Sequence, residues 1–277
     1  AGGTLNFVSS VAYKSFIGGG QSNSVTGRWS TIAGGQANSA GGHYIFVGGG
    51  RAHTATGVYS VISGGAYNTA NGLSSAIAGG QYNSANAELG SIGGGKLNVI
   101  ANAAEGAVIG GGFSNAVHSS HSTVAGGSLH NVSAEYVFVG GGSSHDGSGK
   151  YSVISGGLRN AAGGNVSTIS GGYANAARGA KATIGGGDQN TVQAAAYAAF
   201  IGGGERNIVD NKYAVIAGGF GSSTTGQYTF VGGGRNHVAV GKYSTIAGGL
   251  LNTAGGRLSS VGGGSQKTCT DRKSTRL

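Results

Sequence analysis

Residues 44–53 read YIFVGGGRAH, residues 136–145 read YVFVGGGSSH and residues 228–237 read YTFVGGGRNH. The three copies lie 92 residues apart. A simpler unit repeats within each 92-residue block: an apolar run ends in Ile or Val, and one small residue and a Gly-Gly pair follow it. A period held this strictly is typical of a solenoid, in which each repeat packs only on its neighbours.

The last apolar residue before each Gly pair sets the register of the chain. Successive positions lie 15 residues apart, except for two steps of 17, and Gly2-Gly3 stands one further 17-residue step before the first position. The chain therefore holds 18 units, six to a block. These positions, the core column, are Ile17, Ile32, Val47, Ile62, Ile77, Ile92, Ile109, Val124, Val139, Ile154, Ile169, Ile184, Ile201, Ile216, Val231, Ile246 and Val261.

Short β-branched segments bounded by glycine predict strands in every unit. A helix is excluded, because each Gly of the pair would cost about 0.5–1 kcal/mol in a helix interior relative to Ala. A unit of 15 residues has room for two short strands and two turns. We therefore predict an all-β fold, a parallel β-solenoid of about 18 coils of 15 residues in 92-residue superrepeats.

The composition supports a repeat protein over an ordinary globular domain. The chain of 277 residues has 62 Gly, no Pro, no Met and 9% charged residues. Collagen is excluded, because the glycines follow no triplet period and no Pro is present. Disorder is excluded as well, because Ile and Val return at fixed intervals.

The charge and the cysteine count limit the possible partners. The net charge of +9 includes no run of Lys and Arg and no basic patch interleaved with aromatic residues, so we expect no nucleic-acid partner. A mildly basic surface instead favours anionic polysaccharide or the cell envelope. Cys269 is the only cysteine, which excludes a disulfide framework, and no apolar run is long enough to span a bilayer. We therefore expect no membrane insertion.

The residue six places after the core column is Asn in 12 of the 18 units. Stacked at about 4.8 Å, these Asn side chains can hydrogen-bond along the axis as a ladder. The alternative is that they bind a ligand. We favour an inward polar column that satisfies its own hydrogen bonds, since buried polar groups are nearly always paired.

Histidine replaces Asn at this position in the third unit of each block, at His53, His145 and His237. Six coils separate these residues by roughly 29 Å, so one chain brings no two of them to one metal ion. His118, His121 and His130 form a second group, which has no nearby Cys and only Glu135 within range. We therefore predict no metal site.

The residue before each core-column residue lies on the opposite face of its strand. Where this residue is Phe, the residue two places on is Gly; where it is Thr or Val, that residue is usually Ala or Ser. Such volume compensation is expected where something packs on the surface. Because the core of one coil is thin, we predict self-association through this face. The predicted interface, the outer column, includes Phe16, Thr31, Phe46, Val61, Thr123, Phe138, Val153, Thr168, Phe200, Phe230 and Thr245.

Two further sets of side chains are predicted on the surface. The residues four and five places after the core column, the Gly-turn edge, vary between units and include a possible ligand-facing set for a cell-surface or matrix glycan or protein. That set is Arg51, Tyr67, Tyr82, Arg159, Arg206 and Arg235. A second set, of tyrosines, recurs at equivalent positions of the 92-residue blocks. It predicts stacked rings on the surface, and contact with a ligand is the alternative. It comprises Tyr44, Tyr59, Tyr136, Tyr151, Tyr228 and Tyr243.

Asp188 and Glu205 are the one pair with the spacing of a catalytic site. Both follow the Gly pair directly in consecutive units, and stacking places them about 5 Å apart, as in a retaining glycosidase. Arg206 beside Glu205 favours a solvated turn instead. The repeated Gly-Gly-Gly lacks the Lys-Ser/Thr of a phosphate-binding loop. We predict no catalytic residues, no enzyme activity and no cofactor.

Residues 30–42 read STIAGGQANSAGG, which resembles the head repeats of YadA-like trimeric autotransporter adhesins. The likeness extends from Gly2 to Gly264. It implies a left-handed parallel β-roll, a homotrimer of chains side by side, and a head that binds extracellular matrix or other cells. This unit is one residue longer and carries a Gly pair, and neither neck, stalk nor anchor is seen. Phage and viral fibres contain similar stacked repeats.

Together these features predict a Gly-rich solenoid over residues 1–264. Residues 265–277 have no Gly and five charged residues, which predicts a disordered or foreign tail. We expect an extracellular or cell-surface structural or adhesive module that forms a homotrimer or filament. The alternatives are a phage or viral fibre shaft and an ice-binding solenoid. Ice binding needs a continuous outward Thr array, whereas Phe and Val interrupt the Thr residues of the outer column.

Overall fold

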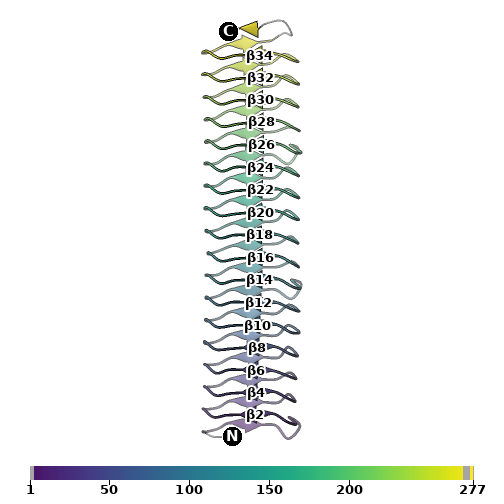
Figure 1. The fold of residues 1–277 in the computed structure, drawn as a ribbon, viewed down its shortest axis with the longest axis vertical. Coiled ribbons are helices and arrows are strands. Elements are labelled where there is room, and N and C mark those ends of the chain that lie inside the picture. The colour runs from purple at the N-terminus through teal and green to yellow at the C-terminus, as the bar shows by residue number, and fades with distance from the viewer. Residues whose placement is uncertain (1–2, 271–274, 277) are drawn as a thin grey trace. The chain divides into compact units, whose positions relative to one another are not determined.

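The computed structural model of the protein describes residues 3–270 and 275–276. It confirms the all-β prediction, since these residues form 36 two-residue strands and no helix. The strands are stacked in parallel as a β-solenoid of about 18 turns (Figure 1). The chain divides into two compact units, unit 1 (residues 1–136) and unit 2 (residues 137–277), and each is described by itself.

Unit 1 contains two parallel sheets, one of odd-numbered and one of even-numbered strands. The odd-numbered strands are β1 (Phe7–Val8), β3 (Ser24–Val25), β5 (Ser39–Ala40), β7 (Thr54–Ala55), β9 (Thr69–Ala70), β11 (Ser84–Ala85), β13 (Val99–Ile100), β15 (Ala116–Val117) and β17 (Asn131–Val132). The even-numbered strands are β2 (Phe16–Ile17), β4 (Thr31–Ile32), β6 (Phe46–Val47), β8 (Val61–Ile62), β10 (Ala76–Ile77), β12 (Ser91–Ile92), β14 (Val108–Ile109) and β16 (Thr123–Val124).

Unit 2 repeats this arrangement. Its even-numbered strands are β18 (Phe138–Val139), β20 (Val153–Ile154), β22 (Thr168–Ile169), β24 (Thr183–Ile184), β26 (Phe200–Ile201), β28 (Val215–Ile216), β30 (Phe230–Val231), β32 (Thr245–Ile246), β34 (Ser260–Val261) and β36 (Thr275–Arg276). Its odd-numbered strands are β19 (Asp146–Gly147), β21 (Ala161–Ala162), β23 (Ala176–Ala177), β25 (Thr191–Val192), β27 (Ile208–Val209), β29 (Ser223–Thr224), β31 (Val238–Ala239), β33 (Thr253–Ala254) and β35 (Thr268–Cys269).

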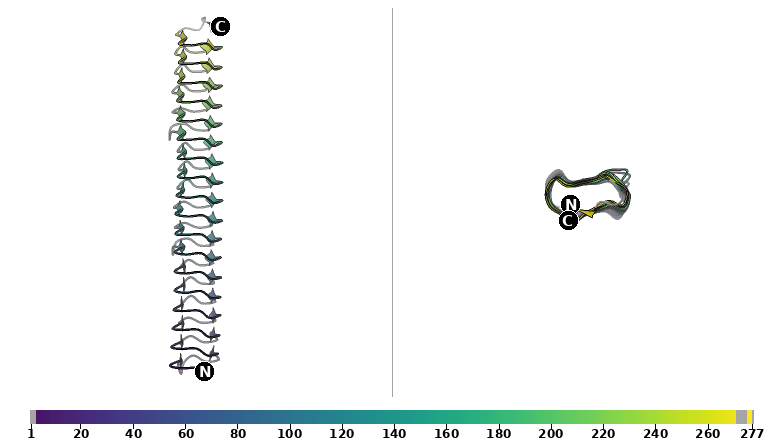
Figure 2. Two further views of the ribbon diagram at one scale, coloured as in Figure 1. Left: turned by 90° about the vertical axis from the view of Figure 1, so that its left-hand side faces the viewer. Right: turned by 90° about the horizontal axis from the view of Figure 1, so that it is seen from above.

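Each strand pairs in register with the equivalent strand of the next turn. In unit 1, for example, β6 pairs with β8 and β7 pairs with β9, both in parallel. A third ladder runs along the Gly-turn edge, where Arg51 forms a bridge with Ala66. Viewed along the stack, the turns of each unit superimpose as a flattened loop with one sheet on each long side (Figure 2). This register places equivalent residues of successive turns above one another.

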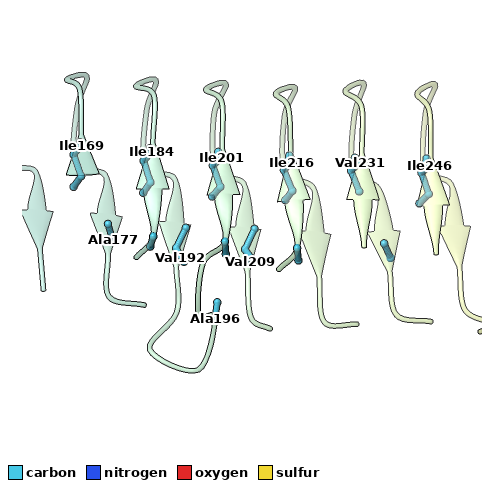
Figure 3. Close-up of a cluster of buried hydrophobic side chains, with 14 of the residues drawn as sticks. Ile169, Ala177, Ile184, Val192, Ala196, Ile201, Val209, Ile216, Val231 and Ile246 are labelled. Carbon is cyan, nitrogen blue, oxygen red and sulfur yellow. The ribbon is translucent and has the colours of Figure 1, made fainter. Parts of the chain in front are cut away.

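The core lies between the two sheets and is one residue deep from each side. The second residue of nearly every strand is buried, whereas the first is exposed or half-buried, as the pleat of a strand dictates. In unit 2, Ile184 and Ile201 of the even-numbered strands face Val192 and Val209 of the odd-numbered strands (Figure 3). A large residue therefore meets a smaller residue across the loop in most turns.

The two glycines of the pair have different structural roles. Gly35 has a φ of +93°, and a Cβ there would collide with the carbonyl oxygen of Gly50 and lie 2.7 Å from Nδ2 of Asn38. A Cβ on Gly34 would meet no atom within 4 Å. Gly35 is therefore required by both backbone and space, whereas Gly34 is not.

The two 17-residue steps lengthen the same turn of the coil. The extra residues lie in the loop between β13 and β14 and in the loop between β25 and β26, which project further than their neighbours (Figure 1). Ala104 and Ala196 in these loops are fully buried. The insertions thus leave the register of both sheets unchanged, as the pairing of β24 with β26 shows.

The stacked turns continue beyond the predicted boundary at residue 264. Thr268–Cys269 of β35 pair with Thr253–Ala254 of β33, and Cys269 is buried where other turns bury Ala or Val. A small outward Thr and a small apolar Cys fit the strand at this position, and disorder of residues 265–277 stays a prediction. Residues 271–274 and 277 lie outside the described part of the chain, and a foreign origin for the tail stays a prediction.

Candidate functional site

The Asn column is a buried hydrogen-bonded ladder, as predicted. Oδ1 of Asn83 accepts a hydrogen bond from the backbone N–H of Asn98 at 3.0 Å. Nδ2 of Asn83 donates to the carbonyl of Gly79 in its own turn at 3.1 Å and to that of Gly95 in the next turn at 3.0 Å. The bonds therefore run chiefly from side chain to backbone, and they tie each Asn to its own Gly pair and to the next turn. The column is structural, because its polar atoms face the protein.

His53 takes the place of Asn in this ladder and is fully buried. Its backbone N–H donates to Oδ1 of Asn38 at 3.0 Å, and its Nδ1 accepts from the backbone N–H of Asn68 at 3.1 Å. The neutral ring must therefore carry its proton on Nε2. Burial lowers the pKa of His53, and the backbone groups of Gly65 and Asn68 oppose that shift only in part. Burial lowers the pKa of His145 and His237 in the same way.

His130 belongs to the same column, although its sequence neighbours suggested a loose cluster with His118 and His121. His130 is buried, and its backbone N–H donates to Oδ1 of Asn115 at 3.1 Å. His118 and His121 are exposed. Its spacing of six residues from Val124 was the signal that identifies His130. The described residues contain no group of three or more His, Cys, Asp or Glu side chains able to hold a metal ion.

The outer column forms the outward face of the even-numbered strands. Its five Phe side chains are 40% to 58% exposed, which is unusual for residues that normally bury most of their surface. Phe200 and Phe230 flank Val215 on successive turns of unit 2. In unit 1, Phe46 likewise lies beside Val61. Each unit thus presents an outward apolar patch in the single chain.

The pairing of Phe with Gly has a cause inside one chain. The ring of Phe46 lies over its own strand, and a Cβ on Gly48 would lie 3.4 Å from Cε1 of that ring. Phe230 and Gly232 repeat this arrangement at 3.3 Å. The volume compensation therefore follows from local packing, and the prediction of self-association depends on the exposure of the Phe rings instead.

The opposite face of the coil differs in chemistry. Among the described residues, the outward residues of the odd-numbered strands include one aromatic side chain, Phe7 of β1; Ser, Thr and Ala are the commonest. Ser39, Thr54 and Thr69 are three successive examples in unit 1. Apart from Phe7, the aromatic surface of the described residues thus lies on the outward face of the even-numbered strands and on the two edges.

The predicted ligand-facing residues of the Gly-turn edge are all exposed, but they are largely engaged with one another. Arg51 lies over the ring of Tyr67 at 5.6 Å from its centroid, and Tyr67 stacks on Tyr82 at 4.7 Å. Arg206 and Arg235 flank the ring of Phe220, at 5.9 Å and 5.1 Å. Arg159 donates to the hydroxyl of Tyr173 at 3.2 Å. Phe220 and Tyr173 were not predicted; their position directly after the Gly pair was the available signal. Ligand binding by this edge stays a prediction.

Asp188 and Glu205 do lie on neighbouring turns, as their spacing predicted, and form a bridge through their backbones. Glu205 forms an ion pair with Arg206 at 3.6 Å, and both side chains are exposed. No pocket exists around them or elsewhere among the described residues. Glu205 therefore has the surroundings of a solvated turn, whereas Asp188 is half-buried and its Oδ1 is shielded from solvent.

The predicted tyrosine ladders form on the edge opposite the Gly pair, which we call the ring edge. Its residues lie eleven and twelve places after the core column, or thirteen and fourteen places in the 17-residue units. Tyr44 stacks on Tyr59 at 4.8 Å, and Trp29 stacks on Tyr44 at 4.9 Å with an angle of 2° between the ring planes. In unit 2, Tyr228 lies 4.9 Å from Tyr213 and 5.0 Å from Tyr243. Trp29 and Tyr213 extend the ladders beyond the predicted residues.

Comparison with known proteins finds no protein-family model that matches the chain, and no curated protein matches it in sequence. Among the described residues, none forms a helix of the length and apolar character that crossing a bilayer requires.

Proposed function

We propose that the chain is a structural and adhesive module that associates with further copies of itself through the outer column and presents a repetitive surface outside the cell. The observation that carries this proposal is the exposure of all five Phe side chains of the outer column, at 40% or more. Exposed apolar patches of this kind mark interaction sites in soluble proteins. A second copy is the natural occupant, because repeated turns present complementary rows of the same spacing.

The resemblance to YadA-like head repeats supports a homotrimer and an extracellular or cell-surface location. A filament uses the same face, and a fibre shaft of phage or viral type is the structural alternative. Ice binding has little support, because Thr168 and Thr183 are the longest run of Thr residues among the paired outer-column strands, and Val153 and Phe200 flank them. A catalytic function has no supporting arrangement of side chains among the described residues.

Capture of soluble chain by immobilised chain tests the self-association. Phe46→Ser, Phe138→Ser and Phe230→Ser together replace three rings with a residue that the same column already uses at Ser91 and Ser260. We expect the triple variant to lose at least tenfold in binding to immobilised wild-type chain, since each ring buries apolar surface at the interface.

A matched control is the triple variant Leu97→Ser, Leu251→Ser and Leu258→Ser, which removes exposed apolar side chains from the two edges. It should bind like the wild type. Equal loss in both variants, or no self-binding by the wild type, would count against the proposed interface.

A further inference from the structure

Positive charge is concentrated in unit 2. Residues 137–270 contain ten Lys and Arg against four Asp and Glu, a net charge of +6. Residues 3–136 contain four Lys and Arg against three acidic residues, a net charge of +1. The two units share one architecture, so this difference is a property of their surfaces alone.

Within unit 2 the cations and the acids lie on different parts of the coil. Asp188 and Glu205 lie on the Gly-turn edge, Asp146 is in β19, and Asp210 directly follows β27. Within residues 137–270, the ring edge of unit 2 has five cations and no acid, and we call these five residues the basic edge. They are Lys150, Lys181, Lys212, Lys242 and Arg257.

The basic edge has a regular spacing along the stack. Its four lysines lie on alternate turns, so consecutive ammonium groups stand roughly 9–10 Å apart along the axis. The ring-to-ring distances of 4.9 Å and 5.0 Å between neighbouring turns agree with this repeat. A linear partner with regularly spaced anions matches such a row.

Three of the four lysines of this edge, Lys150, Lys181 and Lys242, lie over tyrosine rings. Lys181 lies 5.2 Å from the centroid of Tyr197, and Lys242 lies 5.1 Å from that of Tyr243. A hydrogen bond with Tyr197 raises the pKa of Lys181, which stays charged at neutral pH. Within the described residues, Lys181, Lys212 and Lys242 form no ion pair. Their charges are therefore open to an external anion.

The ring stack indicates which kind of polyanion fits. Tyr213, Tyr228 and Tyr243 stack with 13° and 21° between neighbouring ring planes, so each ring covers the face of the next. Single-stranded nucleic acid binds by stacking its bases on open ring faces, which this ladder does not offer. Ring edges, hydroxyls and ammonium groups instead suit the carboxylate or sulfate groups and the hydroxyls of a glycan.

We infer that the basic edge binds a linear anionic polysaccharide, which runs along unit 2 with its carboxylate or sulfate groups on the lysines of alternate turns. This inference rests on the proposed surface-presenting function and identifies its ligand class. The ring edge of unit 1 instead carries three acids, Glu88, Glu105 and Glu135, against Lys14 and Arg28, so it has no excess of positive charge to attract such a polymer. Binding is thus assigned to unit 2.

Binding of the full chain to heparin, polygalacturonate, neutral dextran and single-stranded poly(dT), measured over a series of salt concentrations, tests the inference. Heparin reports on sulfate and polygalacturonate on carboxylate groups. We expect one or both to bind, with affinity falling as salt rises, and dextran not to bind. The variant Lys181→Gln, Lys212→Gln and Lys242→Gln should bind that polymer at least about tenfold more weakly and with a shallower salt dependence.

The matched control is Lys96→Gln, Arg178→Gln and Lys267→Gln, which removes the same charge from positions outside both the basic edge and the predicted ligand-facing set. It should change the affinity less than about threefold if position rather than net charge matters. An equal loss in the control, tighter binding of poly(dT) than of either polysaccharide, or no polysaccharide binding by the wild type would each overturn the inference. Self-capture of the same preparations separates the two proposals, because loss of polysaccharide binding with intact self-capture refutes only the ligand assignment.

Discussion

Three residues of a typical turn have a positive φ, and they differ in what they demand of the side chain. Ala37 and Tyr44 have φ values of 56° and 58°, in the small left-handed region that an L-residue can occupy at a cost of about 1–2 kcal/mol. Gly35, with a φ of +93°, lies outside that region and against the next turn. Ala37 and Tyr44 therefore carry backbone strain, whereas glycine adopts the third positive φ without it.

Gly35→Ala should destabilise the solenoid by more than about 3 kcal/mol, because the new Cβ collides with the carbonyl of Gly50 and the backbone conformation is strained. Gly34→Ala changes the neighbouring residue of the same pair and should stay within about 1 kcal/mol of the wild type. Urea unfolding followed by circular dichroism measures both. Similar losses from the two substitutions would contradict the separate roles of the two glycines.

The buried histidines make stability depend on pH. Since burial lowers the pKa of His53, His145 and His237 below the ordinary value of 6.5, the unfolded chain binds more protons than the folded chain as the pH falls below that value. Stability should therefore be constant above about pH 7 and decline below pH 6.5, by up to about 1.4 kcal/mol per pH unit for each His that stays neutral when folded. In the neutral ring, Nδ1 of His53 accepts a hydrogen bond from the backbone N–H of Asn68. Protonation of Nδ1 would break this bond, because two N–H groups would then face each other.

The variant His53→Asn, His145→Asn and His237→Asn restores the residue of the neighbouring turns and should remove most of this acid sensitivity. His43→Asn, at an exposed His, is the control and should keep it. Thermal unfolding between pH 4.5 and 8 compares the three proteins. Identical pH profiles for the wild type and the triple variant would show that these rings do not govern the acid response.

At the scale of the element, the side chains of the Asn column add hydrogen bonds between successive turns to those that the two-residue strands already make. A single Asn such as Asn83 bonds to three backbone groups in two turns besides its own backbone pairing. The Asn side chains therefore connect neighbouring coils by hydrogen bonds. The interior Ala and Val residues are too small to replace them.

Asn83→Ala should cost about 2–4 kcal/mol, because it leaves the buried N–H of Asn98 and the carbonyl of Gly79 without their partner and removes one of the two hydrogen bonds to the carbonyl of Gly95. Asn71→Ala is the control, since the exposed Asn71 bonds only to the side chains of Thr56 and Asn86. Its effect should remain within about 0.5 kcal/mol. Unfolding midpoints in denaturant would reveal a structural role for the column, and equal effects at the two sites would exclude it.

Column membership could be predicted from spacing, because equivalent residues of stacked turns are 15 residues apart whatever lies between them. The same rule shows why His130 was missed: its backbone N–H bonds to Asn115 of the preceding turn, whereas His118 and His121 are near it only in sequence. The direction of the Asn hydrogen bonds was not predictable. It depends on the glycine carbonyls, whose orientation follows from a positive φ that only the folded turn defines.

At the scale of the whole molecule, the fold class and the repeat number followed from periodicity, while the placement of charge did not. Summed over the chain, a net charge of +9 suggested a uniformly mild basic surface. The structure separates the edges of the coil and shows that unit 2 gathers five cations on one of them. Lys150 and Lys181 are too far apart in sequence to read as a basic run, and only the stack aligns them.

The solution mass of the unmodified chain, measured by sedimentation velocity over a wide range of concentration, tests the proposed association most directly. A species containing several copies of the 26.7 kDa chain and persisting on dilution is the predicted result. A single 26.7 kDa species at every concentration would leave Phe46, Phe138 and Phe230 in water and contradict the proposed role of the outer column.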